Sequence, residues 1–307
     1  MAAIPRHYIH RVIRLIALAG IVAISFSAIF VRLAEIDPSV SALYRVVYAL
    51  PILFVAERIW GGPARPRKVR LLAIAGGIVL GIDLNLWHHS IEWIGAGLST
   101  VLSNLHVLFV GAIAWALYGE RPTAAAIVTI PIGLSGVALI SGLGRDDTFG
   151  TDPVAGTIAG VGAGIAYAGF LLLFRHAMRG RTDHPVGPLL DVTIGATLTG
   201  AVLLIPAGGA DLAPAWPAHA WLLALAVGSQ VLGWLVISTA LPRLPGLETA
   251  LLLLIQPVLT VLWAQLLFDE PLSGLQWAGV AMVLSGTLVT TVRGTIRQSS
   301  EAIPPGS

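Results

Sequence analysis

The sequence predicts an all-α polytopic membrane protein with ten transmembrane helices arranged as two inverted five-helix repeats. Three observations support this fold class: the composition, a series of apolar stretches and an internal duplication. The chain has 307 residues, of which 56% are hydrophobic and 11% charged, and its mean hydropathy is +0.85. Soluble domains carry about 25% charged residues. A chain of this polarity could not cover its surface with groups suited to water, so lipid is the expected solvent.

Ten apolar stretches of about 20 residues each, the length that spans a bilayer, follow one another along the chain. Clusters of turn-forming and charged residues separate them. The first stretch follows basic residues as a signal peptide would, but no small-residue cleavage site follows it, so we expect it to be retained. The predicted spans are 12–32, 38–58, 68–90, 95–118, 123–143, 152–174, 186–206, 216–240, 246–268 and 273–292.

The basic residues predict the orientation of the spans. If the N-terminus is cytoplasmic, 15 of the 18 Lys and Arg residues lie in cytoplasmic segments, whereas Arg32 and Arg145 lie outside and Arg45 lies within a span. Basic residues near span ends resist translocation, so both termini are predicted to be cytoplasmic, with tails at 1–11 and 294–307. The 15 residues are Arg6, Arg11, Arg14, Arg58, Arg65, Arg67, Lys68, Arg70, Arg121, Arg175, Arg179, Arg181, Arg243, Arg293 and Arg297.

A shift of 149 or 150 residues brings two regions of the sequence into register. It aligns Gly97-Leu98-Ser99-Thr100 with Gly246-Leu247-Glu248-Thr249, Glu120 with Glu270, and Leu134-Ser135-Gly136 with Leu284-Ser285-Gly286. We expect one repeat over residues 12–143 and a second over 151–293. Because each repeat has five spans, an odd number, the second is inverted relative to the first. Inverted repeats are typical of secondary transporters, whose sites lie near the middle of the membrane.

Three segments carry a resemblance to a known family. They read RLAEIDPSVSALYR from residue 32, GAGLSTVLSNLHVLFVGAIAWALYGERPT from residue 95 and GLETALLLLIQPVLTVLWAQLLFDEPLS from residue 246. The chain resembles the EamA-type members of the drug/metabolite transporter superfamily, and within it is most similar to the YddG-type exporters of aromatic and other neutral amino acids. The resemblance implies a ten-helix bundle without a cofactor that exports or exchanges small metabolites. The acidic turns at Glu120 and Glu270 differ, so we expect them to cap helices rather than to serve transport.

Charged residues at membrane depth are candidates for function, because each costs at least about 2.5–3.5 kcal/mol to insert. Arg45 lies within the second span, near Tyr44. Its guanidinium would either bind a substrate carboxylate or serve structure by pairing with an Asp or with carbonyls of a broken helix. Asp83 in the third span is a possible proton site, unless a salt bridge to Arg45 neutralises it.

Further polar and aromatic residues recur at helical spacing in four spans. In the third span Asp83 and Trp87 are four residues apart, as are Asn85 and His89, and these two adjacent stripes suggest a cavity wall. For His88 and His89 themselves we expect a position at the membrane interface rather than at the cavity. Pro257 is expected to open its helix near Leu253. The predicted substrate-binding residues are Tyr44, Arg45, Asn85, Trp87, Asn104, His106, Gln230, Trp234, Gln256 and Trp263, with Asp83 as the proton site.

Several function classes lack their sequence signatures. There is no phosphate-binding GxxxxGK[ST] loop, no His-Glu-x-x-His metal motif and no Gly-x-Ser-x-Gly elbow, so we expect neither an ATP-driven pump nor an enzyme, and neither a metal nor a cofactor. Lys68, the only lysine, lies in a loop, which disfavours a retinal protein. A channel or scaffold is a weaker alternative than a transporter, since the duplication favours transport.

The predicted protein is therefore a secondary transporter that exports amino acids by alternating access at a cavity between the repeats. We expect a monomer in the bacterial inner membrane that contacts lipid and a small-molecule substrate and no nucleic acid. Facilitated efflux or exchange is the first hypothesis for its energetics, because the first span has no acidic residue before Glu35. Proton-coupled antiport through Asp83 is the alternative.

Overall fold

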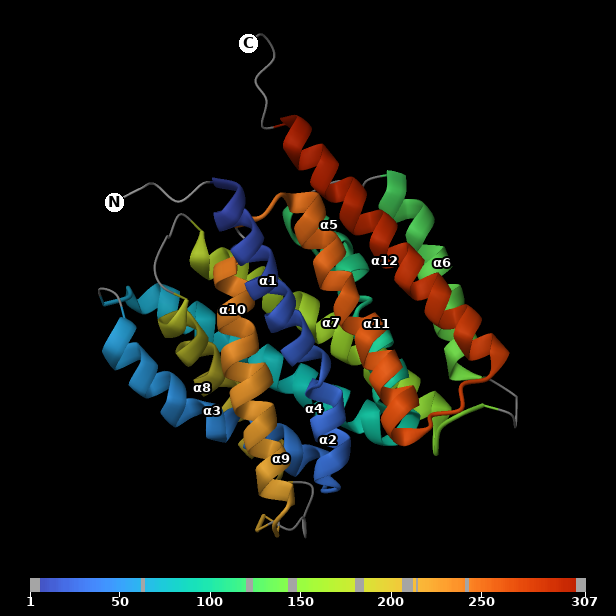
Figure 1. The fold of residues 1–307 in the computed structure, drawn as a ribbon, viewed down its shortest axis with the longest axis horizontal. Helices are drawn as coiled ribbons and strands as arrows, with labels where there is room; N and C mark the ends of the chain where they lie inside the picture. The colour runs from blue at the N-terminus through green and yellow to red at the C-terminus, as the bar shows by residue number, and fades with distance from the viewer. Residues whose placement is uncertain are drawn as a thin grey trace.

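The computed structural model describes residues 6–61, 64–119, 124–142, 148–179, 185–205, 212–213, 215–240 and 243–301. Its regular secondary structure over these residues is entirely helical (Figure 1). The helices are α1 (Arg6–Ser25), α2 (Ser27–Ala34), α3 (Pro38–Trp60), α4 (Arg67–Ser103), α5 (His106–Tyr118), α6 (Ala124–Ser141), α7 (Pro153–Met178), α8 (Val186–Leu203), α9 (Ala218–Ala224), the π-helix η1 (Leu225–Gly233), α10 (Trp234–Ala240), α11 (Gly246–Phe268) and α12 (Gly274–Glu301).

Eight helical stretches of the described chain are long and apolar enough to cross a membrane, and two apolar helices, at His106–Ala116 and Ile127–Ser141, are shorter. The prediction of an all-α chain with several membrane-spanning helices is thus confirmed. The eight stretches are Val12–Ala34, Pro38–Trp60, Arg67–Ser103, Pro153–Met178, Val186–Leu203, Ala218–Ala240, Leu251–Phe268 and Gly274–Arg293. The division into ten spans and two inverted repeats stays a prediction.

The third and fourth predicted spans are joined differently from the expectation. α4 continues from Arg67 to Ser103 and contains one non-helical residue, Gly95, with φ 82° and ψ 170°. The left-handed φ suits glycine, which lacks the Cβ that disfavours this region. The separation from α5 falls at Asn104 and Leu105. α4 is therefore two helical segments that meet at a kink.

Two other helices depart from the expected regular geometry. The eighth span changes from α-helix to π-helix at Leu225 and back at Trp234. The ninth contains Pro257 within an uninterrupted α11, so the predicted opening near Leu253 is wrong. Proline removes one hydrogen bond from the ladder, and a helix in lipid tolerates this when the neighbouring turns stay bonded.

The bundle has two distinguishable ends. α1 begins and α12 ends on the same side in Figure 1, which we call the termini end. Toward this end Arg14, in the first half of α1, donates to Glu248 at the start of α11, Nη2 to Oε2 at 3.0 Å. At the opposite end, the amide of Thr151 donates to the carbonyl of Trp93 at 2.8 Å, joining the start of α7 to α4.

The centre of the bundle is formed by α4 packed against α7 and α8. α4 and α8 touch through their backbones, because a Cβ at Gly77 would lie 2.0 Å from the Val192 carbonyl oxygen and one at Gly195 would lie 2.1 Å from that of Ile74. Only residues without a side chain permit this approach. The contact fixes the helix that supplies Asp83 and Trp87 to the cavity described next.

Candidate functional site

A cavity of about 320 Å³ lies among α1, α2, α3, α4, α5, α7, η1, α10, α11 and α12. Eight of the eleven predicted site residues line it: Arg45, Asp83, Trp87, Asn104, His106, Gln230, Trp234 and Gln256. Twelve further residues complete the wall: Ile24, Ser27, Leu80, Leu84, Ser103, Val107, Tyr167, Leu171, Leu253, Leu254, Thr287 and Thr291. The wall thus combines a few polar groups with apolar and aromatic surface, as small-molecule sites do.

The other three predicted residues lie outside the cavity wall. The hydroxyl of Tyr44 donates to the carbonyl of Leu212, and Nδ2 of Asn85 donates to Oγ of Ser39 at 2.9 Å. Trp263 donates from Nε1 to Oγ of Ser25 at 3.0 Å. Each side chain makes a contact between helices or loops, so a direct part for any of them in substrate binding stays a prediction.

Arg45 is held at the cavity by its neighbours on other helices. It is 6% exposed, its Nε donates to Oε1 of Gln230 at 2.8 Å, and its Cζ lies 5.6 Å from the centre of the Trp87 ring. The structure shows no ion pair between Arg45 and any described carboxylate. Asp83 lines the same cavity and is also 6% exposed. The predicted alternative of an Arg45–Asp83 salt bridge is therefore not the arrangement found here.

Three cavity residues have buried polar atoms without a hydrogen-bond partner among the described residues. These atoms are Ser27 Oγ, Trp87 Nε1 and Gln230 Nε2. A buried donor or acceptor left unpaired costs about 1–3 kcal/mol, so such atoms mark places where a polar ligand would be stabilised. The sequence analysis missed Ser27, because one serine in an apolar stretch carries no pattern of its own.

The break between α4 and α5 supplies two more polar residues. Nδ2 of Asn104 donates to the carbonyl of Thr100 at 2.8 Å, and Nδ1 of His106 lies 3.0 Å from the carbonyl oxygen of Ser103. The His106 ring meets Tyr167 edge to face, with ring centres 4.7 Å apart. The predicted residues Asn104, His106 and Gln256 therefore do line one cavity. A helix break, and not an unwound Pro257, positions the first two.

Thr287 and Thr291 of α12 were also missed. They are four residues apart and so share one face of the helix, which is the signal that could have identified them. The hydroxyl of Thr287 donates to the carbonyl of Val283 at 2.9 Å, a bond within the helix. Their presence extends the cavity wall toward the termini end.

A second cavity, of about 460 Å³, lies at the opposite end of the bundle. His88 lines it, is fully buried, and its Nδ1 lies 3.0 Å from Oγ of Ser41. The interface position that we expected for His88 is therefore wrong, because its side chain is buried against α3. His89 is half-buried and its ring lies 5.4 Å from that of Trp93.

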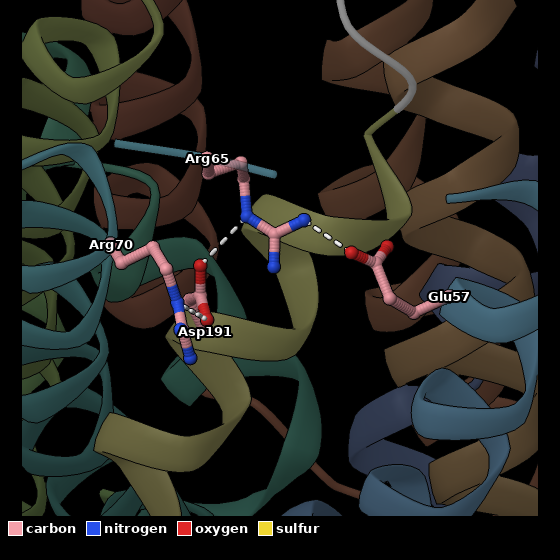
Figure 2. Close-up of polar contacts among 4 residues, drawn as sticks. All are labelled: Glu57, Arg65, Arg70 and Asp191. Atoms are coloured by element: carbon pink, nitrogen blue, oxygen red, sulfur yellow. Dashed lines mark hydrogen bonds and ion pairs between the residues drawn. The ribbon is translucent and has the colours of Figure 1, made fainter. Parts of the chain in front are cut away.

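An ionic network at the termini end ties together α3, the α3–α4 loop, α4 and α8 (Figure 2). Asp191 of α8 accepts from Nε of Arg65 at 3.0 Å and from Nε of Arg70 at 3.4 Å, and Arg65 also pairs with Glu57 of α3. The side chain of Asp191 is 1% exposed. Burial alone would lower the pKa of Arg65, but its bonds to Glu57 and Asp191 outweigh that effect and raise the pKa above its ordinary value. The network locks the α3–α4 loop onto α8.

Glu270, in the turn between α11 and α12, caps the second segment of α4. Its carboxylate accepts from the amide of Ala96 at 2.8 Å and from that of Gly97 at 3.2 Å. Those amides begin a helical segment and have no partner within it. Burial raises the pKa of Glu270, although these two bonds and nearby Arg32 oppose the rise. The prediction that the acidic turns cap helices holds for Glu270, while Glu120 lies outside the described residues.

Comparisons with known proteins agree with this architecture. A protein of Synechocystis sp. (strain ATCC 27184 / PCC 6803 / Kazusa), described as the uncharacterized transporter sll1319, is 24% identical over 264 residues, which cover 78% of this chain and 75% of the relative. A crystal structure with 18% sequence identity matches with a TM-score of 0.61 over 92% of this chain and 98% of its own, which shows a shared fold.

A family comparison gives the broader class. The model of the EamA-like transporter family matches residues 12–142 and 154–292, most of the chain. Together with the long apolar helices, this match indicates an integral membrane transporter of small molecules rather than an enzyme. The chain belongs to the EamA-like transporter family.

Proposed function

We propose that the protein exports amino acids, aromatic and other neutral ones, by alternating access at the central cavity, as a YddG-type exporter would. The observation that carries this proposal is the cavity itself, which places one buried guanidinium and one buried carboxyl group in a single apolar and aromatic wall. A zwitterion needs both groups, and its side chain needs the wall. The cavity volume of about 320 Å³ suits a small metabolite.

The aromatic lining favours large neutral side chains. Trp234 packs edge to face against Phe170, with ring centres 5.8 Å apart, and Tyr167 bridges Trp234 and His106. Aromatic pairs of this kind stabilise contacts by about 0.5–1.5 kcal/mol beyond the area they bury. Such a wall would accept Phe, Trp and Tyr without requiring one of them.

The proposed alternating access draws support from the unequal closure of the two ends. At the opposite end, Oγ1 of Thr260 donates to the carbonyl of Ser25 at 2.9 Å, and Trp263 stacks on Phe26 at 4.9 Å, which joins α11 to the α1–α2 junction. Toward the termini end, Leu253 of the cavity wall is 39% exposed. With both termini cytoplasmic, as the basic residues predict, we propose that the contacts of Thr260 and Trp263 close the cavity toward the outside.

We further propose that the cavity lies between two inverted repeats, 12–143 and 151–293, in a monomer of the bacterial inner membrane. We expect facilitated efflux or exchange. Proton-coupled antiport through Asp83 is the second candidate, and it is favoured by the position of Asp83 at the cavity without an ion pair among the described residues. Efflux from proteoliposomes separates the two: flux should persist without a pH gradient, whereas flux lost both without the gradient and in Asp83→Asn establishes antiport.

The test of the site uses labelled Phe and Trp in proteoliposomes. Trp234→Ala and His106→Ala should lower transport of both substrates while leaving the protein inserted and folded, because each removes part of the cavity wall. Trp60→Ala is the control, since Trp60 lies at the end of α3 and is 59% exposed. Wild-type rates in both cavity variants would show that substrate binds elsewhere.

A further inference from the structure

The polar groups around Arg45 are arranged as a cluster of hydrogen-bond donors. Nε of Arg45 donates to Oε1 of Gln230, which fixes the orientation of the Gln230 amide. The reverse orientation would set two donors against each other. The amide nitrogen Nε2 is thereby left as a donor, buried and without a partner among the described residues.

Trp87 adds a second unpaired donor to this cluster. Its Nε1 is buried without a partner in the described structure, and its ring centre lies 5.6 Å from Cζ of Arg45. Arg45, Gln230 and Trp87 are 6%, 1% and 7% exposed, so water outside the bundle does not satisfy them. Arg and Trp side chains donate only, and the one acceptor oxygen of Gln230 is already used by Arg45.

We infer that Arg45, Gln230 and Trp87 form a receptor for one carboxylate, so that a carboxylate is the obligatory part of the substrate. A carboxylate offers two oxygens and about four lone-pair sites to a guanidinium and two neutral donors. An amine without a carboxylate would bring a like charge to Arg45. A carboxamide would set its own NH₂ group against the donors. The inference rests on the proposed function and names the substrate class as monocarboxylates of amino-acid size.

The ammonium group is the secondary determinant. Asp83 lines the same cavity and supplies a carboxyl group for an ammonium, but among the described residues it forms no hydrogen bond or ion pair with the donor cluster. Removal of the ammonium from the ligand thus leaves the Arg45 cluster satisfied, whereas removal of the carboxylate leaves two buried donors unpaired and Arg45 without a counter-charge. Charge-assisted bonds stabilise by about 1.5–3 kcal/mol each, so loss of one or more should weaken binding at least about tenfold.

The test measures competition with labelled Phe uptake into proteoliposomes that contain the wild-type protein. Three probes differ in one group each: 3-phenylpropionate lacks the ammonium, phenethylamine lacks the carboxylate, and phenylalaninamide carries a carboxamide in its place. We expect 3-phenylpropionate to compete, and the other two to compete at least about tenfold more weakly. Phenethylamine that competes as well as 3-phenylpropionate would overturn the inference.

Variants connect the result to the named residues. Trp87→Phe keeps an aromatic ring and removes the indole N–H. Arg45→Lys keeps the positive charge and removes the planar guanidinium group. Both should weaken competition by 3-phenylpropionate, and Trp60→Phe, at an exposed position far from the cavity, should not. Unchanged competition in both cavity variants would show that the carboxylate binds elsewhere.

A binding measurement keeps the inference separate from the proposed function. If the wild-type protein does not transport Phe, the amino-acid proposal fails, and thermal unfolding of the detergent-solubilised protein with each probe then decides about the carboxylate. Stabilisation by 3-phenylpropionate that Trp87→Phe and Arg45→Lys reduce supports the receptor. Stabilisation by phenethylamine alone, or by none of the three probes, refutes it.

Discussion

Removing the carboxylate of Glu270 should destabilise the protein by a predictable amount. The side chain is fully buried, and its two oxygens accept from the amides of Ala96 and Gly97 at 2.8 and 3.2 Å. Glu270→Ala would leave both amides buried and unpaired, at about 1–3 kcal/mol each, or about 2–6 kcal/mol in total. Glu270→Gln keeps one acceptor oxygen and loses one bond, so its cost should be about 1–3 kcal/mol.

The measurement is the free energy of unfolding in mixed micelles, with helical signal as the probe. The expected order of stability is wild type, then Glu270→Gln, then Glu270→Ala. Glu92→Ala is a matched control, because Glu92 is an exposed carboxylate on the same helix as the capped amides, and surface changes usually stay within about 0.5 kcal/mol. If Glu270→Ala unfolds within that margin of wild type, the cap does not stabilise the α4 kink and the reasoning is refuted.

Three further predictions concern the pKa of Glu270, the ionic network of Asp191 and the orientation of the chain in the membrane. Because the pKa of Glu270 is raised above its ordinary 4.5, the folded state binds the proton of this carboxyl group more tightly than the unfolded state does. The free energy of unfolding should therefore fall as pH rises from 4.5 through the raised pKa. Glu270→Gln, which does not titrate, should lack this pH dependence. Asp191→Asn should lower the free energy of unfolding by about 3–5 kcal/mol, since it breaks a buried ion pair. Glu248→Gln, at the more exposed pair with Arg14, should lower it by at most about 1 kcal/mol. Equal losses in the two variants would show that the Asp191 network does not stabilise the fold more than a surface pair does. Single cysteines in this cysteine-free chain should react with an external membrane-impermeant reagent at position 269 but not at position 67, and reaction at position 67 would reverse the predicted topology.

The helices were predictable because apolar length and turn residues act locally. The predicted span 38–58 became Pro38–Trp60, with Asp37 accepting from the amides of Ser39 and Val40 to cap it, and 186–206 became Val186–Leu203. The helices α1 and α12 extend beyond the predicted spans into the predicted tails, to Arg6 and Glu301. The kink in α4 at Gly95 lies at the predicted boundary between the spans 68–90 and 95–118, but its cap was not predictable, because the capping carboxylate lies 174 residues from Ala96 in the sequence.

The site was predictable as far as helical spacing allows. Polar and aromatic stripes identified eight residues that reach one cavity. The spacing of residues along one helix does not indicate which neighbouring helix packs against a given face. Tyr44 and Asn85 were therefore predicted wrongly as part of the cavity wall, and instead donate hydrogen bonds to Leu212 and Ser39 outside it. Ser27 was not predicted because it belongs to no polar stripe, and only the packing of the surrounding helices places it in the cavity wall.

The backbone contact between α4 and α8 constrains any motion that opens and closes the cavity. A side chain as small as alanine at Gly77 or Gly195 would overlap a carbonyl oxygen, so these helices have no space in which to rotate against each other. The Arg65 network fixes the same pair again at the termini end. Under the proposed mechanism, α4 and α8 are then a stationary frame that carries Asp83 and Trp87, and the displacement belongs to α11 and the α1–α2 junction. The substrate would keep one half of its contacts throughout the cycle and exchange the other.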